Sequence, residues 1–278
     1  MKNILSLGAG VQSSTVLLMS CVGELPKLDA CVFADTGWEP KAVYAQLEWL
    51  IDFAGKHDIP IDVVSTSNIK NDALVSQVRG KAEDGNRWAA MPYFVLGPNG
   101  EKGMIRRQCT YEYKIRPIEK WTRRKILGLK HRQRAPKELT VRQWFGISHD
   151  EFTRMRTSNH KWCEHYYPLV DMGMTRQGCL NWLEQHDFPR APRSACIGCP
   201  FHNNEEWRYL KNESPEEFQE AADFDRAVRK CGGMRGDIYL HAARKPLDEI
   251  DFRTDVDKGQ KLLFESGLTE ECQGMCGM

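Results

Sequence analysis

Asn3-Ile4-Leu5-Ser6-Leu7-Gly8-Ala9-Gly10-Val11-Gln12-Ser13-Ser14, near the start of the chain, decides the fold. Its first five residues predict a buried strand, and Gly8 to Ser13 predict a loop. Ser14 can then cap a helix over Thr15 to Val22, which stops at Gly23. This order is typical of phosphate-binding α/β proteins, because small residues let the backbone approach an anion and the helix N-terminus points amides at it. A tight turn without a ligand explains a glycine pair equally well.

Strands and helices alternate after this segment. Apolar runs predict strands over 30–34, 61–64 and 141–147, and amphipathic spacing predicts helices from Pro40 to Ala54, near Tyr111 to Leu127, and from Thr175 to His186. This alternation indicates βαβ units. The expected fold class is α/β, a mostly parallel twisted sheet with helices on both faces and a small, mainly helical C-terminal region. Ligands on such sheets bind at the carboxyl ends of the strands.

The expected domains are an α/β domain over residues 1–210 and a helical extension over 211–278. Glycines and prolines between residues 80 and 103 predict turns, so a basic insertion of loops and one helix is expected over about 80–140. Ser214-Pro215-Glu216-Glu217 predicts a capping box at the start of a later helix. No signal peptide and no run of about 18 apolar residues is seen, which favours a cytoplasmic protein without a membrane partner.

Four segments, taken in order, resemble a known family. Leu5 to Ser14 is similar to the nucleotide loop of the phosphoadenosine-phosphosulfate (PAPS) reductases, which belong to the adenine nucleotide alpha hydrolase (PP-loop) superfamily. The reductases carry Gln in this loop, here Gln12, where the ATP-cleaving members of the superfamily carry Asp. Ala34-Asp35-Thr36-Gly37-Trp38-Glu39 resembles the family's Asp-Thr-Gly segment after the second strand. Gly146 to Arg154 resembles its Gly-x-Arg-x-x-x-Ser segment, with Ser148 in place of Arg, and Tyr167-Pro168-Leu169 also matches.

The resemblance implies a site for an adenine nucleotide, either ATP or a sulfonucleotide. The residues expected to bind the nucleotide or its phosphates are Ser6, Gly8, Ala9, Gly10, Gln12, Ser13, Ser14, Asp35, Thr36, Gly37 and Arg154. Arg154 and Arg156 have forked donors suited to phosphate or sulfate, although either can instead pair with Glu151.

Ten cysteines in a cytoplasmic protein favour metal, cluster or thiol chemistry over disulfides. Cys196-Ile197-Gly198-Cys199 places two thiolates one turn apart, a spacing that lets both bind one metal or cluster. Cys109 resembles the cysteine segment that partners this pair in iron-sulfur sulfonucleotide reductases, which have two adjacent cysteines there. A [4Fe-4S] cluster held by Cys109, Cys196, Cys199 and, as the candidate fourth ligand, Cys179 is the leading prediction. Zinc, with His202 as a substitute ligand, and no metal are the alternatives.

Glu271-Cys272, near the C-terminus, resembles the Glu-Cys-Gly segment whose thiol attacks sulfate sulfur in the reductases. The resemblance makes Cys272 the candidate catalytic nucleophile, and implies a thiol reductant or a sulfur donor as a partner. Because Cys276 lies four residues later, Cys272 and Cys276 could instead form a resolving pair of thiols or supply extra metal ligands. Cys21, Cys31 and Cys231 lie in apolar settings and are expected to be buried packing residues.

Positive charge is concentrated in residues 106–142, which contain 13 Lys and Arg against three Glu in a chain of net charge +1. Such an excess can attract an anionic partner, and the interleaved Tyr111, Tyr113, Trp121 and Trp144 would suit base stacking. RNA or DNA is therefore a candidate partner of this stretch. A solvated charged surface explains the charge equally well, and aromatics at helical spacing are more often core residues.

Three functions fit these patterns. The first is an enzyme of sulfur or redox chemistry resembling the PAPS reductases, an oxidoreductase acting on a sulfonucleotide. The second is an ATP pyrophosphatase that adenylates a base of tRNA or DNA and replaces its oxygen with sulfur. The third is a noncatalytic nucleotide-binding or nucleic-acid-binding protein of the same fold.

Overall fold

A computed structural model describes residues 1–79, 91–230 and 236–253. The described chain forms two compact units that are interleaved in the sequence: unit 1 comprises residues 1–66 and 110–195, and unit 2 lies within 67–109 and 196–253. The expected α/β class is confirmed, because unit 1 is built on a parallel sheet with helices on both of its faces. The domain boundary expected at residue 210 stays a prediction.

The sheet of unit 1 has five parallel strands in the order β3-β2-β1-β6-β7. Strand β1, which precedes the glycine loop, is therefore the central strand, and β2 and β6 flank it. In the pairing register, Leu7 at the end of β1 lies opposite Phe33 of β2, and Ser6 lies opposite Phe145 of β6. The strands are β1 (Lys2–Leu7), β2 (Ala30–Asp35), β3 (Ile61–Ser65), β6 (Val141–Phe145) and β7 (Cys163–Tyr166).

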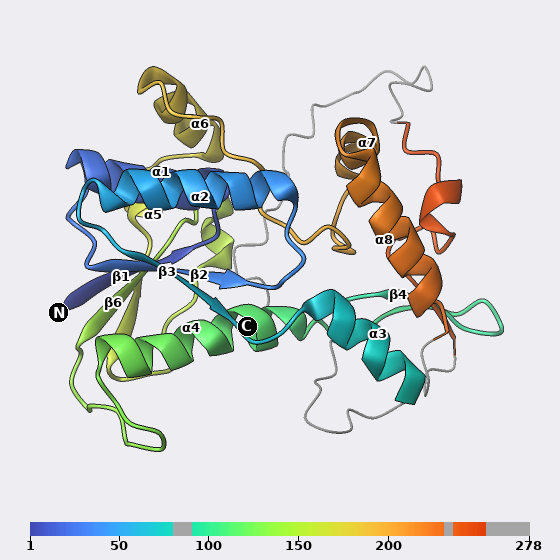
Figure 1. Ribbon diagram of the computed structural model, residues 1–278, viewed down its shortest axis with the longest axis horizontal. Coiled ribbons are helices and arrows are strands. Elements are labelled where there is room, and N and C mark those ends of the chain that lie inside the picture. The colour runs from blue at the N-terminus through green and yellow to red at the C-terminus, as the bar shows by residue number, and fades with distance from the viewer. Residues whose placement is uncertain (80–90, 231–235, 254–278) are drawn as a thin grey trace. The chain divides into compact units, whose positions relative to one another are not determined.

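Side-chain alternation along the strands divides the core of unit 1 into two layers. Leu5 and Phe33 face one side, where they pack with helices α1, α2 and α6, whereas Ile4 and Val32 face the opposite side and pack with α4. Figure 1 shows α1 and α2 on one face of the sheet and α4 on the other. The helical segments of unit 1 are α1 (Val11–Val22), α2 (Lys41–Gly55), π-helical turns η1 (Tyr111–Ile115) and η2 (Thr122–Ile126) flanking α4 (Arg116–Trp121), the 3-10 helix η3 (His149–Arg154), α5 (Pro168–Asp171) and α6 (Arg176–Gln185).

The described part of unit 2 combines a small antiparallel sheet, ordered β5-β4-β8, with the helices α3, α7 and α8. Asp225 of α8 is fully buried and ties two loops to that helix, because it accepts hydrogen bonds from the backbone N–H groups of Leu240 (2.7 Å) and Leu247 (3.2 Å). Burial raises the pKa of Asp225, and its ion pair with Arg229 opposes that shift. The elements of unit 2 are α3 (Ile69–Arg79), β4 (Phe94–Leu96), β5 (Lys102–Met104), α7 (Asn204–Glu213), α8 (Pro215–Val228), β8 (Asp237–Tyr239) and the 3-10 helix η4 (Leu247–Glu249).

Three local predictions were wrong. Helix α1 begins at Val11 with Gly10 as its N-cap, so Ser14 lies inside the helix instead of capping it. The region expected to contain only loops and one helix also holds β4 and β5, whose three residues each are too short to show a periodic pattern.

The third error concerns the capping box expected at Ser214. Ser214 precedes α8 but caps no backbone N–H, because it also ends α7 and its φ of −140° and ψ of 63° suit neither role. The capping box lies one helix earlier, where Asn203 and Glu206 reciprocally satisfy the first turn of α7.

Within the described ranges, no helix combines the length and the apolar character needed to cross a bilayer.

Candidate functional site

The glycine loop follows the central strand at the carboxyl edge of the sheet. Ala9 adopts a left-handed φ of 56°, and Gly10 is extended with a φ of −91° and a ψ of −178°. Gly10, the N-cap of α1, has no side chain to cap the helix, and the first turn holds no acidic residue, so neither offsets the partial positive charge of the helix N-terminus. The turn therefore has the electrostatic character of an anion site.

The two serines of the loop use their hydroxyls differently. Ser13 shapes the loop, because its Oγ accepts a hydrogen bond from the N–H of Gly8 (3.1 Å) and donates to the carbonyl of Gly10 (3.4 Å). The Ser14 hydroxyl is fully buried and, among the residues that the structure describes, has no hydrogen-bond partner. A buried hydroxyl without a partner costs free energy, so Ser14 is suited to a ligand that supplies the missing acceptor.

Gln12 connects the loop to the 3-10 helix η3. Its side chain is fully buried, and its Nε2 donates to Oε2 of Glu151 (2.9 Å) and more weakly to Oγ of Ser148 (3.4 Å). The other oxygen of Glu151, Oε1, accepts from Arg154 at 2.6 Å. The structure thus brings together two of the predicted site residues, Gln12 and Arg154, through a carboxylate that lies between them.

Gly146, directly after β6, allows this close approach. A Cβ at this position would lie 2.5 Å from the backbone nitrogen of Ser13 and 2.6 Å from its Cα. Real Cβ atoms do not approach backbone this closely, so only glycine fits without moving the start of α1. Neither Gly146 nor Glu151 was predicted as a site residue, since the steric role of Gly146 depends on strand pairing. The segment that contains both was recognised only as a motif.

The Asp-Thr-Gly segment ends β2, next to the central strand. Asp35 accepts hydrogen bonds from the N–H of Gly37 (2.7 Å) and from the Tyr44 hydroxyl (2.8 Å), whose pKa is raised by burial and by this carboxylate. Thr36 donates to Glu39 (3.0 Å), and Lys114 lies 3.4 Å from the same Glu39 oxygen. A buried ion pair therefore fixes the turn, and Lys114, which was not predicted as a site residue, joins η1 to it.

Ser6, the remaining residue of the predicted nucleotide set, lies in β1 itself. Its Oγ accepts a hydrogen bond of 2.7 Å from Nε2 of Gln143 on the neighbouring strand β6. Its hydroxyl oxygen therefore already helps to join these two strands within the sheet. The nucleotide-binding role of Ser6 stays a prediction.

The cysteine pair of unit 2 lies in a tight turn just before α7. The N–H of Cys199 donates to the carbonyl of Cys196 (3.0 Å), and the N–H of His202 donates to the carbonyl of Cys199 (3.1 Å). The His202 ring also holds this turn, since its Nε2 lies 3.0 Å from the Cys196 carbonyl oxygen and its Nδ1 3.5 Å from Oε2 of Glu206. His202 thus supports the turn through Nε2, an arrangement that a metal-binding histidine also shows, and its role as a zinc ligand stays a prediction.

The other predicted metal ligands are Cys109, in unit 2, and Cys179, in unit 1. Cys179 is fully buried in the apolar core beneath α6, together with Trp182 and Leu183 as the helical spacing predicted. Over residues 1–79, 91–230 and 236–253, no group of three or more His, Cys, Asp or Glu side chains is arranged to hold a metal ion. The cluster stays a prediction, for which a tight backbone turn places Cys196 and Cys199 one turn apart.

Two of the cysteines expected to be packing residues lie in unit 1. Cys31 is fully buried in the core, as predicted, and Cys21 is partly buried and packs against the same core cluster. Cys231, the candidate nucleophile Cys272 and Cys276 lie outside the described residues.

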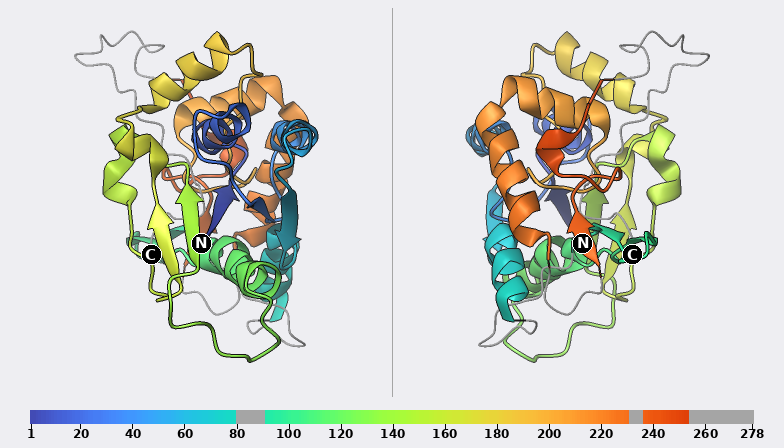
Figure 2. Two further views of the ribbon diagram at one scale, coloured as in Figure 1. Left: turned by 90° about the vertical axis from the view of Figure 1, so that its left-hand side faces the viewer. Right: turned by 90° about the vertical axis from the view of Figure 1, so that its right-hand side faces the viewer.

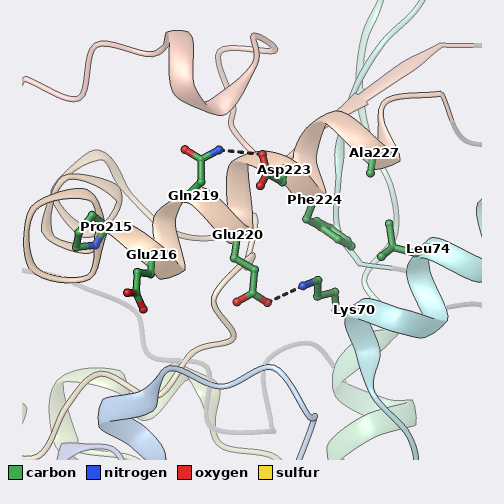
Figure 3. A pocket seen from close by; sticks show the side chains of 9 residues that line it. All are labelled: Lys70, Leu74, Pro215, Glu216, Gln219, Glu220, Asp223, Phe224 and Ala227. Atoms are coloured by element: carbon green, nitrogen blue, oxygen red, sulfur yellow. Dashed lines mark hydrogen bonds and ion pairs between the residues drawn. The ribbon is translucent and has the colours of Figure 1, made fainter.

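A hollow of about 720 Å³ lies between α3 and α8 of unit 2 (Figure 3). Phe224 and Leu74 give it an apolar lining, and the carboxylates of Glu216, Glu220 and Asp223 line it as well. Its one lysine, Lys70, lies 2.8 Å from Glu220. The excess of negative charge makes this hollow a poor place for a nucleotide phosphate, in contrast to the glycine loop of unit 1.

No protein-family model matches the sequence, and no curated protein matches it significantly. The resemblance to the PAPS reductases therefore depends on the ordered motifs alone.

Proposed function

We propose that this protein is an adenine-nucleotide-binding enzyme of sulfur and redox chemistry, similar to the sulfonucleotide reductases. One observation carries the proposal: the start of α1, with glycine at its N-cap and a buried Ser14 hydroxyl that has no partner among the described residues, follows the central strand at the carboxyl edge of a parallel sheet. This edge is where open parallel sheets bind their ligands, and amides at a helix N-terminus bind phosphate or sulfate.

The neutral side chain of Gln12 favours a sulfonucleotide over ATP cleavage. In ATP-cleaving relatives of the suggested family this position is Asp. Here a carboxylate at position 12 would face Glu151, which accepts the Gln12 amide at 2.9 Å, and two buried carboxylates at that distance repel each other. Gln12 and Glu151 therefore form a matched donor and acceptor, which supports the assignment to the reductase type.

A [4Fe-4S] cluster, when bound, would supply redox or electrostatic chemistry, with Cys196 and Cys199 as two of its ligands. The role of the protein itself is to hold Cys196 and Cys199 one turn apart. The backbone hydrogen bonds of this turn and the His202 ring support that arrangement. In the proposed reaction, two thiols are oxidised to a disulfide, the sulfonyl group leaves the nucleotide as sulfite, and the nucleoside phosphate is released.

A turnover panel tests this proposal. Anaerobically reconstituted protein is incubated with ATP, adenylyl sulfate or PAPS, with a dithiol as the reductant, and sulfite and pyrophosphate are both measured. Thiol-dependent sulfite release that is lost in Gln12→Ala and Cys196→Ala is the expected result. Tight nucleotide binding without either product would instead support a noncatalytic binding protein, and would overturn the enzymatic proposal.

ATP-dependent sulfur transfer to a nucleic-acid base is the second candidate function. The exposed cations of α4, η2 and the loop that follows favour it, because a nucleic-acid substrate needs a positive surface. Pyrophosphate release from ATP that RNA or DNA stimulates would support this candidate and count against the reductase.

A further inference from the structure

The basic stretch divides into cations with structural partners and cations exposed to solvent. Lys125 pairs with Asp62 (2.5 Å), Arg116 with Glu112 (3.1 Å), and Arg142 with Glu164. Six further Lys and Arg side chains of the stretch that belong to unit 1 are exposed and, within the described part of the chain, make no ion pair: Lys120, Arg124, Lys130, Arg132, Arg134 and Lys137. We refer to these six as the basic face.

The basic face lies on the outside of unit 1. Ile118 and Trp121 of α4 pack against the sheet, so Lys120 and Arg124, one turn apart, point away from the core. The other four lie in the loop between η2 and β6, which extends beyond α4 at the bottom of Figure 2. All six cations therefore come from one continuous segment of the surface.

Backbone and side-chain hydrogen bonds fold this loop back onto η2. Arg123 donates to the carbonyl of Gln133 (2.8 Å), and the N–H of Leu129 donates to the carbonyl of Arg123 (2.9 Å). The Gln133 side chain in turn accepts from the N–H of Lys130 (2.9 Å). Since the loop is held in this way, its cations are presented with less conformational freedom to lose on binding.

The aromatic residues interleaved with the basic stretch are core residues. Tyr113, Trp121 and Trp144 are 1%, 8% and 1% exposed, so they are unavailable for stacking with bases. Among these aromatics Tyr111 alone is exposed, at 50%. Recognition by the basic face would therefore depend on phosphates and not on unstacked bases.

We propose that the basic face binds the phosphate backbone of a nucleic-acid duplex. A run of six exposed cations along one held segment can contact several of the closely spaced phosphates of a duplex. Each phosphate contact releases counterions, which makes the affinity strongly dependent on salt. The inference is independent of the nucleotide loop, since none of the six residues contributes to that loop.

The test compares two triple variants by fluorescence anisotropy with labelled 20-base-pair RNA and DNA duplexes and with their single strands. Lys130→Ala/Arg132→Ala/Arg134→Ala removes three charges from the basic face. Lys27→Ala/Lys56→Ala/Arg190→Ala removes three exposed charges elsewhere on unit 1 and serves as the matched control. Circular dichroism and nucleotide binding check that both variants remain folded.

The wild type should bind duplexes with a dissociation constant on the order of 1–100 μM near physiological salt. The basic-face variant should bind at least about tenfold more weakly, with a log–log salt slope less steep by about two to three, and the control should match the wild type. Equal affinity of the two variants would overturn the proposal. Preference for single strands, or binding to phosphatidylserine vesicles without binding to duplexes, would also overturn it.

Discussion

Ser14 and Ser20, both buried on α1, differ in what their hydroxyls contact. Ser20 accepts from the N–H of Leu28 and donates to the carbonyl of Pro26, both at 3.0 Å, whereas the Ser14 hydroxyl has no partner among the described residues. Ser14→Ala should leave the free energy of unfolding unchanged or slightly raised, because no hydrogen bond is lost. It should weaken sulfonucleotide binding at least about tenfold, since a hydrogen bond to a charged group contributes about 1.5–3 kcal/mol.

Ser20→Ala is the matched control, with the opposite pattern. It should lower the free energy of unfolding by about 1–2 kcal/mol and leave nucleotide affinity unchanged. Urea unfolding and titration calorimetry measure the two quantities. If Ser14→Ala destabilises the protein as much as Ser20→Ala and binds nucleotide normally, Ser14 is an ordinary packing residue.

Gly146→Ala tests the contact between β6 and the loop. Its Cβ would overlap the backbone of Ser13, so the start of α1 must shift. We expect a loss of about 1–3 kcal/mol of stability together with a loss of nucleotide binding. Gly55→Ala, whose Cβ would meet nothing within 4 Å, should be neutral or slightly stabilising. Normal nucleotide binding by Gly146→Ala would show that the loop tolerates this displacement.

Asn203, which caps α7, and Ser214, which precedes α8, should contribute differently to the stability of the protein. Asn203 accepts from the N–H of Glu206 (2.9 Å), whereas the Ser214 side chain caps nothing at α8. Asn203→Ala should therefore lower the free energy of unfolding by about 1 kcal/mol, and Ser214→Ala should change it little. The measurement is urea denaturation of both variants, and equal effects would contradict the assignment of the capping box.

The long elements of unit 1 could be predicted from sequence because each carries a full period of its apolar pattern. The β1 strand and α6, with Cys179, Trp182 and Leu183 on one side, are examples. The start of α1 was misplaced because Ser14 has the chemistry of a cap, while the N-cap position is set by the extended backbone of Gly10. Strand β5 pairs with β4 in a short hairpin, and β4 pairs in addition with β8, which is distant in sequence, so no local pattern reveals these three-residue strands.

At the scale of the whole molecule, the candidate site combines residues that are far apart along the chain. The motifs identified Gln12 and Arg154, and the sequence already offered Glu151 as a partner for Arg154, but that the same carboxylate also accepts from Gln12 could not be predicted from spacing alone. The interleaving of the two units was likewise not evident, because contacts between residues 67–109 and 196–253 are long-range. The residue types that the site needs could therefore be predicted from sequence motifs more readily than the contacts between their side chains.

The rate at which each thiol is alkylated tests which cysteines are buried. Burial raises the pKa of Cys21 and of Cys163 to about 11, which lowers their thiolate fraction at pH 8 by about 100-fold. Both should be alkylated by iodoacetamide far more slowly in the native protein than in urea, as measured by peptide mass spectrometry. Their reactivity should rise as the pH approaches 11. Equal rates in the native and unfolded protein at pH 8 would contradict the burial of these thiols.

Direct binding of a sulfonucleotide tests the central claim, that the loop after β1 is an adenine-nucleotide site. Titration calorimetry of adenylyl sulfate into the wild type, Ser14→Ala and Ser20→Ala isolates the loop from the later chemistry. We expect saturable binding by the wild type and Ser20→Ala, and at least about tenfold weaker binding by Ser14→Ala. Absence of binding by the wild type, or equal affinity of all three proteins, would contradict it.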